Sequence, residues 1–324
     1  MTNVIVVSPD RDLEIDYLTE FQRTKKVEQN LFYTTEGAET FYTYRDADLE
    51  QIKWEDEYAF LARQYFWRMD KNITFVSLGC GNAGPEKMLL HHAHAEGYHI
   101  TYFGVDSSSS MLQLADANLA QESFDRNFVL ADFSTAPFRQ KLHELIAGDD
   151  VCIYAMLGGT FGNFDQRAIA GILDRTVGVG DYVYLDVVPR YASDAQNQQL
   201  RNRLSQLPRN LDRFFAHLLE KLCIPQESGE LFGEETSEQA LDAWRYAFFF
   251  QAKEELTFPC YGGSLTLVPG ECLELMNVRA YNPASLKDFI ESQGFVFVDE
   301  YIPDVGNLKH LWQRFLFEKQ RELG

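Results

Sequence analysis

Short apolar runs alternate with amphipathic stretches through the middle of the chain. The runs are rich in β-branched and aromatic residues and predict strands, whereas the stretches between them carry apolar residues at helical spacing and predict helices. The expected strands are residues 74–78, 100–105, 127–130, 151–156 and 182–188, and the expected helices are residues 86–95, 111–122, 138–147 and 166–176. Strands that alternate with helices typically form a parallel sheet covered on both faces.

The alternation stops near residue 190 and resumes near residue 282. The intervening pattern predicts two helices, residues 193–207 and 211–222, followed by β-like runs at 244–250 and 264–268. The alternating pattern then predicts a helix at 283–293, ended by Gly294, and strands at 295–299 and 312–318. We therefore expect a seven-stranded, doubly wound, Rossmann-like α/β sheet with an inserted α+β lid.

This pattern divides the chain into four parts. We expect a helical and aromatic cap over residues 1–71, the main α/β core over 72–190, an inserted lid or substrate domain over 191–281, and completion of the core sheet over 282–324. The cap and the insertion would together form the lid. A lid over the carboxyl edge of an open sheet would enclose a small-molecule site.

Composition and charge narrow the classes of partner. The 324 residues are 45% hydrophobic and 24% charged, as in ordinary globular proteins. Lys and Arg number 29 against 49 Asp and Glu, and a net charge of −20 would repel a phosphate backbone, so we expect a small-molecule substrate and no nucleic acid. Five cysteines without a CxxC pair indicate reduced thiols and a cytoplasmic protein. The apolar run at residues 4–7 is too short for a membrane span.

A glycine-rich turn follows the first strand of the alternating region. Residues 75–84, FVSLGCGNAG, lead from an apolar run into a predicted helix, and Gly79, Gly81 and Gly84 match the GxGxxG spacing. Glycines at such a turn let the backbone approach a ligand at a helix N-terminus. The motif alone is weak, because a tight turn that binds nothing has the same pattern.

Carboxylates follow the next two strands. Asp106 lies 25 residues after Gly81 and could accept hydrogen bonds from both ribose hydroxyls of an adenosine, or could cap the helix that begins near Ser108. Asp132 could accept from an adenine amine, while Phe133 offers an apolar face to the ring. The three strand ends together are more specific than any one of them.

In this order the strand ends resemble those of class I S-adenosylmethionine-dependent methyltransferases. The resemblance covers about residues 72–190 and 282–318 and implies a final strand that enters antiparallel between its neighbours. It implies S-adenosylmethionine as cofactor and no metal. We assign the cofactor to Gly79, Cys80, Gly81, Lys87, Asp106, Ser107, Asp132, Phe133 and Met156. Ser77 departs from the pattern, because many members carry an acid there.

The fourth strand and its loop narrow the family. Residues 151–164, VCIYAMLGGTFGNF, resemble the Leu-Gly-Ser-Thr-Ile-Gly-Asn-Phe loop of the histidine-specific methyltransferases, which trimethylate the α-amine of histidine. This resemblance implies Asn163 as the residue that orients an acceptor amine, although an asparagine there could instead satisfy its own turn. Tyr33, in an aromatic segment similar to that of the family, is a candidate pocket wall or hydrogen-bond partner.

The acceptor is expected to differ from histidine. The family's Gly-Glu hairpin, matched here by Gly270 and Glu271, continues to a Glu-x-Ser pair that meets the imidazole, and the matching positions here are Met276 and Val278. Burying an imidazole without partners costs about 1–3 kcal/mol per unsatisfied group. We therefore expect N-methylation of another amino acid or amino-acid-like metabolite.

Other interpretations stay open at this point. An O- or C-methyltransferase would have the same fold, and a non-catalytic S-adenosylmethionine-binding protein would have the same cofactor loop. An NAD-dependent oxidoreductase fits less well, because it leaves Asp132, Phe133 and the loop of Asn163 unexplained.

We interpret residues 227–238, which are rich in glutamate, as a solvated loop.

Overall fold

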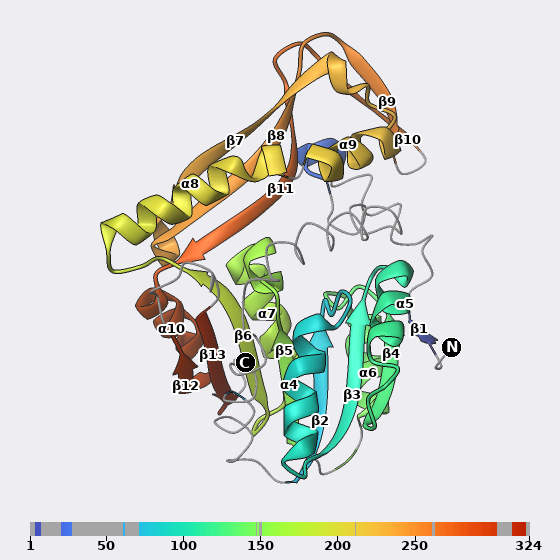
Figure 1. Cartoon of the computed structure of the whole chain (residues 1–324), viewed down its shortest axis with the longest axis vertical. Coiled ribbons are helices and arrows are strands. Elements are labelled where there is room, and N and C mark those ends of the chain that lie inside the picture. Colours follow the sequence, from blue (N-terminus) through green and yellow to red (C-terminus); the bar gives the residue numbers. More distant parts are fainter. Residues whose placement is uncertain are drawn as a thin grey trace. The chain divides into compact units, whose positions relative to one another are not determined.

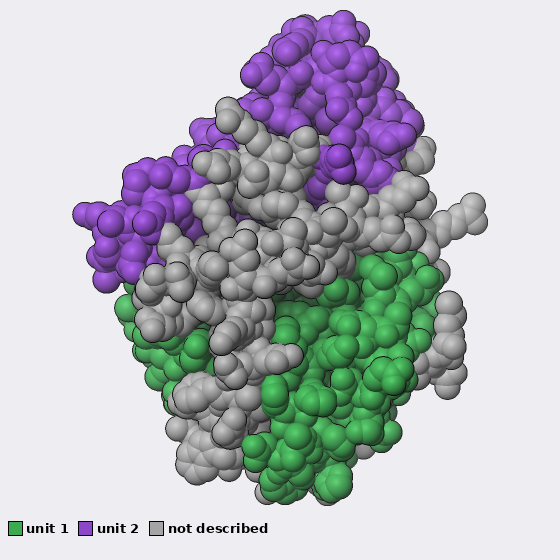
Figure 2. Space-filling view, viewed as in Figure 1, with its two compact units in different colours: residues 1–8, 52–189, 281–324 green, residues 9–51, 190–280 purple. Residues whose placement is uncertain are grey.

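The computed structural model describes residues 4–7, 21–27, 61, 71–146, 148, 151–210, 212–260, 263–302 and 313–321. The chain divides into two compact units, drawn in different colours in Figure 2. Unit 1 comprises Met1–Ser8, Ile52–Pro189 and Tyr281–Gly324, and unit 2 comprises Pro9–Gln51 and Arg190–Ala280. Among the described residues, none of the helices is both long and apolar enough to span a membrane.

Unit 1 contains a twisted, mostly parallel sheet (Figure 1). Its strands are β1 (Val4–Val6), β2 (Asn72–Leu78), β3 (His99–Asp106), β4 (Asp125–Leu130), β5 (Val151–Met156), β6 (Tyr182–Pro189), β12 (Phe295–Tyr301) and β13 (Gln313–Lys319). Their pairings give the order β1-β4-β3-β2-β5-β6-β13-β12, in which β13 runs antiparallel to both β6 and β12. The α/β fold and the antiparallel final strand agree with the sequence analysis.

The first strand is a correction to the expected domain boundaries. Val4–Val6 pairs in parallel with Phe128–Leu130 at the edge of the core sheet, although we expected residues 1–71 to form a cap. Three apolar residues are too few to show a strand period, so the assignment depends on the edge that β4 offers. The units also divide the chain after Pro189 and after Ala280, where the sequence analysis placed boundaries after residues 190 and 281.

The helices of unit 1 begin at capping residues or at proline. They are α4 (Gly84–Ala95), α5 (Ser109–Asn118), α6 (Ala136–Leu145), α7 (Gln166–Thr176) and α10 (Pro283–Ser292). The side chains of Ser108, Thr135, Asp165 and Asn282 accept hydrogen bonds from the first turns of α5, α6, α7 and α10. Helix α4 has Pro85 in its first turn, and the amide of its first residue, Gly84, donates to Oδ1 of Asn82 at 3.0 Å.

Aromatic rings fill part of the core of unit 1. Tyr102 on β3 lies with its ring centroid 6.4 Å from that of Phe75 on β2 and 6.2 Å from that of Phe128 on β4. All three side chains are buried. Packing across adjacent strands of this kind fixes the positions of the strand ends.

Unit 2 is an antiparallel sheet with two helices. The strands β7 (Gly229–Glu238), β8 (Ala243–Ala252) and β11 (Cys272–Tyr281) pair in the order β7-β8-β11, and β9 (Leu256–Cys260) pairs with β10 (Gly263–Leu267). The helices are α8 (Asp194–Asn210) and α9 (Asp212–Lys221). Phe215 of α9 lies 6.0 Å from Phe248 of β8 between ring centroids, so α9 covers one face of the sheet.

Two expectations for the insertion were wrong. Residues 227–238, interpreted as a solvated loop, form the end of a short 3-10 helix (Gln226–Ser228) and then β7, which pairs with β8 along its whole length. Strand β7 has one paired side, and charged side chains are common on such edge strands. The sequence analysis also left out β9 and β11, since β11 contains a bulge between Glu274 and Met276 that interrupts its period of two.

Candidate cofactor and acceptor site

The glycine turn between β2 and α4 is fixed to the end of the neighbouring strand. Gly79 and Gly81 have positive φ angles of 73° and 53°, which glycine adopts at little cost. The backbone amides of Gly79 and Cys80 both donate to the carbonyl oxygen of Val105, at 2.9 and 3.0 Å. The turn therefore lies against the carboxyl end of β3, as a ligand loop of an open α/β sheet does.

Asp106, the last residue of β3, joins this turn to the next helix. Its Oδ2 accepts from the amide of Gly81 at 3.0 Å and its Oδ1 from the amide of Ser108 at 2.9 Å. Burial raises the pKa of Asp106 to about 6, although backbone amides of Ser108, Gly81 and Ser107 act in the opposite direction. Ser108, not Asp106, is the cap of α5. Each carboxylate oxygen can accept a further hydrogen bond, as two ribose hydroxyls would require.

The loop after β5 packs directly on the glycine turn. A Cβ atom built on Gly79 would lie 2.8 Å from Cγ2 of Thr160, a distance that real Cβ contacts do not show. Thr160 begins the 3-10 helix η2 (Thr160–Asn163), and its hydroxyl donates to the carbonyl oxygen of Leu157 at 3.0 Å. The absence of a side chain at Gly79 thus allows the two loops to meet at the same edge of the sheet.

Asn163 is the last residue of η2 and is half-buried. The turn of this helix is closed by the amide of Gly162, which donates to Gly159 O at 3.0 Å. Among the described residues, the Asn163 side chain has no hydrogen-bond partner, so its amide is not used by its own turn.

Asp132 and Phe133, the two residues predicted to contact the adenine, lie at the third strand end, after β4. Asp132 accepts from the amide of Ser134 at 2.8 Å, which fixes its carboxylate in a turn. Phe133 is buried, and its ring centroid lies 5.3 Å from that of Phe164, which directly follows η2. The aromatic side chain at this strand end therefore contacts the loop that carries Asn163.

A buried carboxylate near the glycine turn was not assigned from the sequence. Glu86, in the first turn of α4, accepts from the hydroxyl of Ser77 at 2.5 Å, and both side chains are buried. The pKa of the Cys80 thiol is raised, mainly because the thiol is buried. The charges of Asp106 and, to a smaller extent, of Glu86 raise it further. The structure thus supplies an acid beside Ser77 from the next helix. A glutamate nine residues after that serine was the only signal for it.

The remaining predicted residues are placed as follows. Lys87 donates to Oδ1 of Asn118 at 3.3 Å, and Asn118 in turn donates to the carbonyl oxygen of Asn82 at 3.0 Å, so this lysine braces the glycine turn against α5. Met156 is buried at the end of β5. Tyr33 lies outside the described residues.

Asp186 and Tyr281 hold the loop after β5 and the helix that follows it. The amide of Gly158 donates to Asp186 Oδ2 at 3.2 Å, and Asp186 Oδ1 accepts from Arg314 Nε at 3.1 Å. Tyr281 accepts from Gln166 at 3.1 Å, and its ring centroid lies 5.7 Å from that of Phe161. The loop is therefore fastened to β6, β13 and the end of β11.

The arrangement fits S-adenosylmethionine. A buried carboxylate at the second strand end suits the ribose, and an aromatic ring at the third suits the adenine. Among the described residues there is no cluster of three or more metal-ligating side chains.

The sheet order and these strand ends define the class of Rossmann-like, S-adenosylmethionine-dependent methyltransferases. The model of the histidine-specific, S-adenosylmethionine-dependent methyltransferases matches residues 14–183, more than half of the chain. The protein belongs to this family. The predicted family and cofactor are thereby confirmed.

Solved structures, methyltransferases among them, resemble the chain at low sequence identity. One from Clostridium acetobutylicum shares 12% identity, covers 86% of this chain and 97% of its own, and has a TM-score of 0.44. The PH0226 protein from Pyrococcus horikoshii shares 14% identity, with 89% and 100% covered and a TM-score of 0.47. The glycopeptide N-methyltransferase MtfA shares 12% identity, with 79% and 92% covered and a TM-score of 0.37. No curated protein matches the chain.

Proposed function

We propose that the protein transfers a methyl group from S-adenosylmethionine to the amine of an amino acid or amino-acid-like metabolite other than histidine. The observation that carries this proposal is the contact between Gly79 and Thr160. Through it, the loop that bears Asn163 lies against the predicted cofactor turn, so a side chain suited to an amine and the residues suited to the cofactor share one edge of the sheet.

Methyl transfer mainly requires that the protein align the amine with the methyl group and exclude water from the site. The cofactor supplies an electrophilic methyl group on a sulfonium, and transfer is an in-line displacement that needs no strong base once the amine is neutral. The carbonyl of the Asn163 amide can accept a hydrogen bond from the amine and so direct its lone pair. An apolar enclosure with few polar contacts would favour the neutral amine over the charged one.

The sequence of β11 supports an acceptor other than histidine. Met276 and Val278 occupy the positions where the family resemblance expects glutamate and serine, and both are half-buried. Their partners across the sheet are Phe248 and Tyr246. An imidazole placed over the two apolar side chains would lose both of its expected hydrogen-bond partners, at about 1–3 kcal/mol for each.

A labelling experiment tests this function. The protein is incubated with S-adenosylmethionine carrying an isotopically labelled methyl group, together with the twenty amino acids or a small-metabolite extract, and products are found by mass spectrometry. We expect label on the amine of an amino-acid-like compound and turnover of histidine at least about 100-fold slower, which corresponds to the two lost interactions.

Two outcomes would contradict the proposal. Efficient trimethylation of histidine would show that Met276 and Val278 do not exclude it, and label found only on oxygen or carbon would favour an O- or C-methyltransferase. The Asn163→Ala variant is the matched control: it should lose turnover while it still binds S-adenosylhomocysteine.

A further inference from the structure

The loop between β5 and η2 begins with two adjacent glycines. Gly158 and Gly159 have φ angles of 65° and 85°, in the left-handed region that glycine adopts at little cost. Apart from its chain neighbours, none of the described residues lies within 4 Å of a Cβ atom built on Gly158, so side-chain packing does not fix this part of the backbone. Asn163 follows Gly158 by only five residues. Its position therefore depends on the contacts that hold the loop.

A carboxylate on the next strand of the sheet provides such a contact. Asp186 of β6 accepts from the amide of Gly158 through Oδ2 at 3.2 Å, and from Nε of Arg314 through Oδ1 at 3.1 Å. Asp186 and Arg314 are directly opposite one another in the pairing of β6 with β13, and β6 pairs on its other side with β5 (Figure 1). The guanidinium also lies over the ring of Tyr301 on β12, 5.7 Å from its centroid. Arg314 therefore orients the carboxylate, and the carboxylate in turn holds the first glycine of the loop.

The ion pair of Asp186 and Arg314 is buried, which makes it a poor source of stability. Each side chain is only 1% exposed. Burial raises the pKa of Asp186, the amide of Gly158 acts in the opposite direction, and the charge of Glu86 raises the pKa further. Burial also lowers the pKa of Arg314. Buried pairs of this kind are often no more stabilising than apolar side chains of the same volume, so what this pair supplies is a fixed acceptor for the loop.

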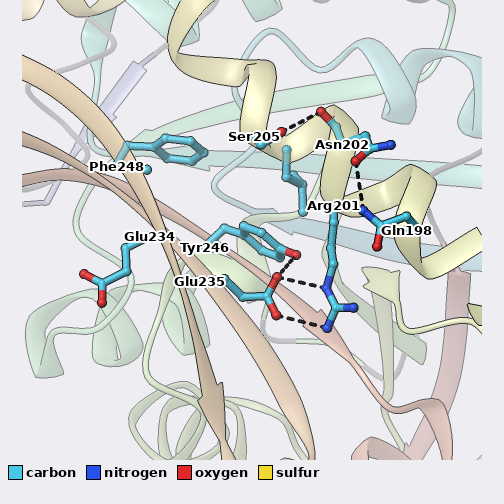
Figure 3. A pocket seen from close by; sticks show the side chains of 10 residues that line it. Gln198, Arg201, Asn202, Ser205, Glu234, Glu235, Tyr246 and Phe248 are labelled. Carbon is cyan, nitrogen blue, oxygen red and sulfur yellow. Dashed lines mark hydrogen bonds and ion pairs between the residues drawn. The ribbon is translucent and has the colours of Figure 1, made fainter.

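An ion pair of unit 2 shows the contrast (Figure 3). Arg201 of α8 donates from Nε and Nη2 to the carboxylate of Glu235 on β7, at 3.0 and 3.1 Å, and the hydroxyl of Tyr246 on β8 donates to the same carboxylate. These side chains line a pocket of about 260 Å³, and Arg201 and Glu235 are 37% and 32% exposed. Water competes for both groups of an exposed pair, and all three side chains belong to a helix or a strand. Asp186 differs because it is buried and because it holds a loop.

We infer that Asp186 is a positioning residue for methyl transfer: its carboxylate, oriented by Arg314, holds the loop of Asn163 at the edge of the sheet through the amide of Gly158. The inference rests on the proposed function where it concerns Asn163. The hold on the loop itself involves only residues of unit 1 and can be tested without an acceptor.

Methyl transfer is sensitive to such a hold. An in-line displacement requires the nucleophile at a short distance and in the right direction, and a misplacement of about 1 Å can lower the rate about 100-fold. Without the carboxylate of Asp186, the exposed Gly158 can turn its amide to water, because two glycines allow other backbone conformations. The loop would then lose its fixed position, while Asp106 and the glycine turn keep theirs. Loss of the hold should therefore lower turnover and leave cofactor binding intact.

Two double variants test the hold, because they differ in a single acceptor. Asp186→Asn/Arg314→Met removes both charges and keeps an oxygen for the amide of Gly158. Asp186→Leu/Arg314→Met removes both charges and that oxygen, and leucine has nearly the shape of asparagine. Both variants replace the whole ion pair, so neither leaves a buried charge without its partner.

Amide hydrogen exchange of residues 157–165, followed by mass spectrometry, measures the hold directly. We expect exchange in this segment to be about tenfold faster in the leucine double variant than in the asparagine double variant, and the latter to stay within about threefold of the wild type. Urea unfolding of the same proteins measures their global stability, so a local change is distinguished from a general one.

Turnover is measured with labelled S-adenosylmethionine and the amino acid that the labelling experiment identifies. We expect kcat to be about 10- to 100-fold lower in the leucine than in the asparagine double variant, with affinity for S-adenosylhomocysteine within about threefold in the two. A residue that contributes only to stability would shift the urea midpoint and leave kcat of the folded protein unchanged.

Asp181→Leu is the matched control. Asp181 directly precedes β6 and accepts from the amides of Cys152 and Gly178, at 3.0 and 3.2 Å, so it holds backbone amides at the other end of β5. This variant should lower global stability without a change in kcat or in the exchange of residues 157–165. If it changes both as much as the leucine double variant does, the effect is general and the inference is overturned.

A single variant covers the case in which the leucine double variant does not fold. In Asp186→Asn the one side-chain oxygen would accept from the charged Arg314 rather than from Gly158, so residues 157–165 should exchange faster and kcat should fall, and adding Arg314→Met should restore both. Equal exchange of the segment with and without an acceptor for Gly158, or faster exchange with unchanged kcat, would overturn the inference. If no N-methylated product is found, the proposed function fails, and hydrogen exchange alone still decides whether Asp186 holds the loop.

Discussion

Replacing Gly79 by alanine tests the packing of the cofactor turn on the loop of Asn163. The added Cβ would lie 2.8 Å from Thr160 Cγ2, and the residue has a φ of +73°. An alanine in this left-handed backbone conformation destabilises the folded state by about 1–2 kcal/mol. Forcing a methyl group into a packed contact adds about 1–3 kcal/mol. We therefore expect Gly79→Ala to lower the free energy of unfolding by about 2–5 kcal/mol.

The Gly97→Ala variant separates the cost of the left-handed backbone from the cost of the close contact with Thr160. Gly97 has a φ of +86°, and nothing lies within 4 Å of its added Cβ, so alanine there meets the backbone cost alone, about 1–2 kcal/mol. Thr160→Ser removes Cγ2 and keeps the hydroxyl that donates to Leu157. In the Gly79→Ala background it should restore about 1–3 kcal/mol.

Urea denaturation is measured for the wild type, Gly79→Ala, Gly97→Ala and the double variant Gly79→Ala/Thr160→Ser. If the slope of the unfolding free energy against urea is the same for all four, the shifts of the midpoints give the differences in stability. In parallel, titration with S-adenosylhomocysteine should show weaker binding to Gly79→Ala than to Gly97→Ala. Equal destabilisation by the two alanine variants, or failure of Thr160→Ser to restore stability, would refute the contact between the loops.

Three further predictions concern the same site and its support. Because burial raises the pKa of Asp106 to about 6 and the ionised carboxylate is the better acceptor, affinity for S-adenosylhomocysteine should be constant above about pH 6 and fall about tenfold per unit below it, as measured by calorimetry across that range. Asn163→Ala should lower kcat about 10- to 100-fold with unchanged S-adenosylhomocysteine affinity, and weakened cofactor binding would contradict its role on the acceptor side. Arg314→Met should lower stability in urea by about 3–5 kcal/mol, because it leaves the buried carboxylate of Asp186 without its cation, and adding Asp186→Asn should recover most of the loss.

The core of unit 1 was predictable because its elements are defined locally. Strand β5 and helix α7 have the bounds expected from the sequence, Val151–Met156 and Gln166–Thr176. A buried parallel strand is a short apolar run ended by turn residues, and its helix carries a cap and an apolar stripe. The strand ends could be grouped into one site because the carboxyl ends of parallel strands meet at one edge.

Unit 2 was harder to predict because its contacts are distant in the sequence. Residues 229–238 alternate weakly and carry the charges of an edge strand, so only pairing with β8 identifies β7. The cluster of Arg201, Glu235 and Tyr246 has no spacing motif, since a helix and two strands bring it together. The hydrogen bond between Ser77 and Glu86 in unit 1 was missed for another reason, because it crosses a turn with irregular backbone angles.

The central claim is that the glycine turn and Asp106 form an S-adenosylmethionine site. Calorimetric titration with S-adenosylhomocysteine and with NAD, on the wild type and on Asp106→Ala, tests it most directly. We predict micromolar binding of S-adenosylhomocysteine to the wild type, loss of that binding in Asp106→Ala, and no binding of NAD. Failure of the wild type to bind S-adenosylhomocysteine, or equal binding by the correctly folded variant, would contradict the account.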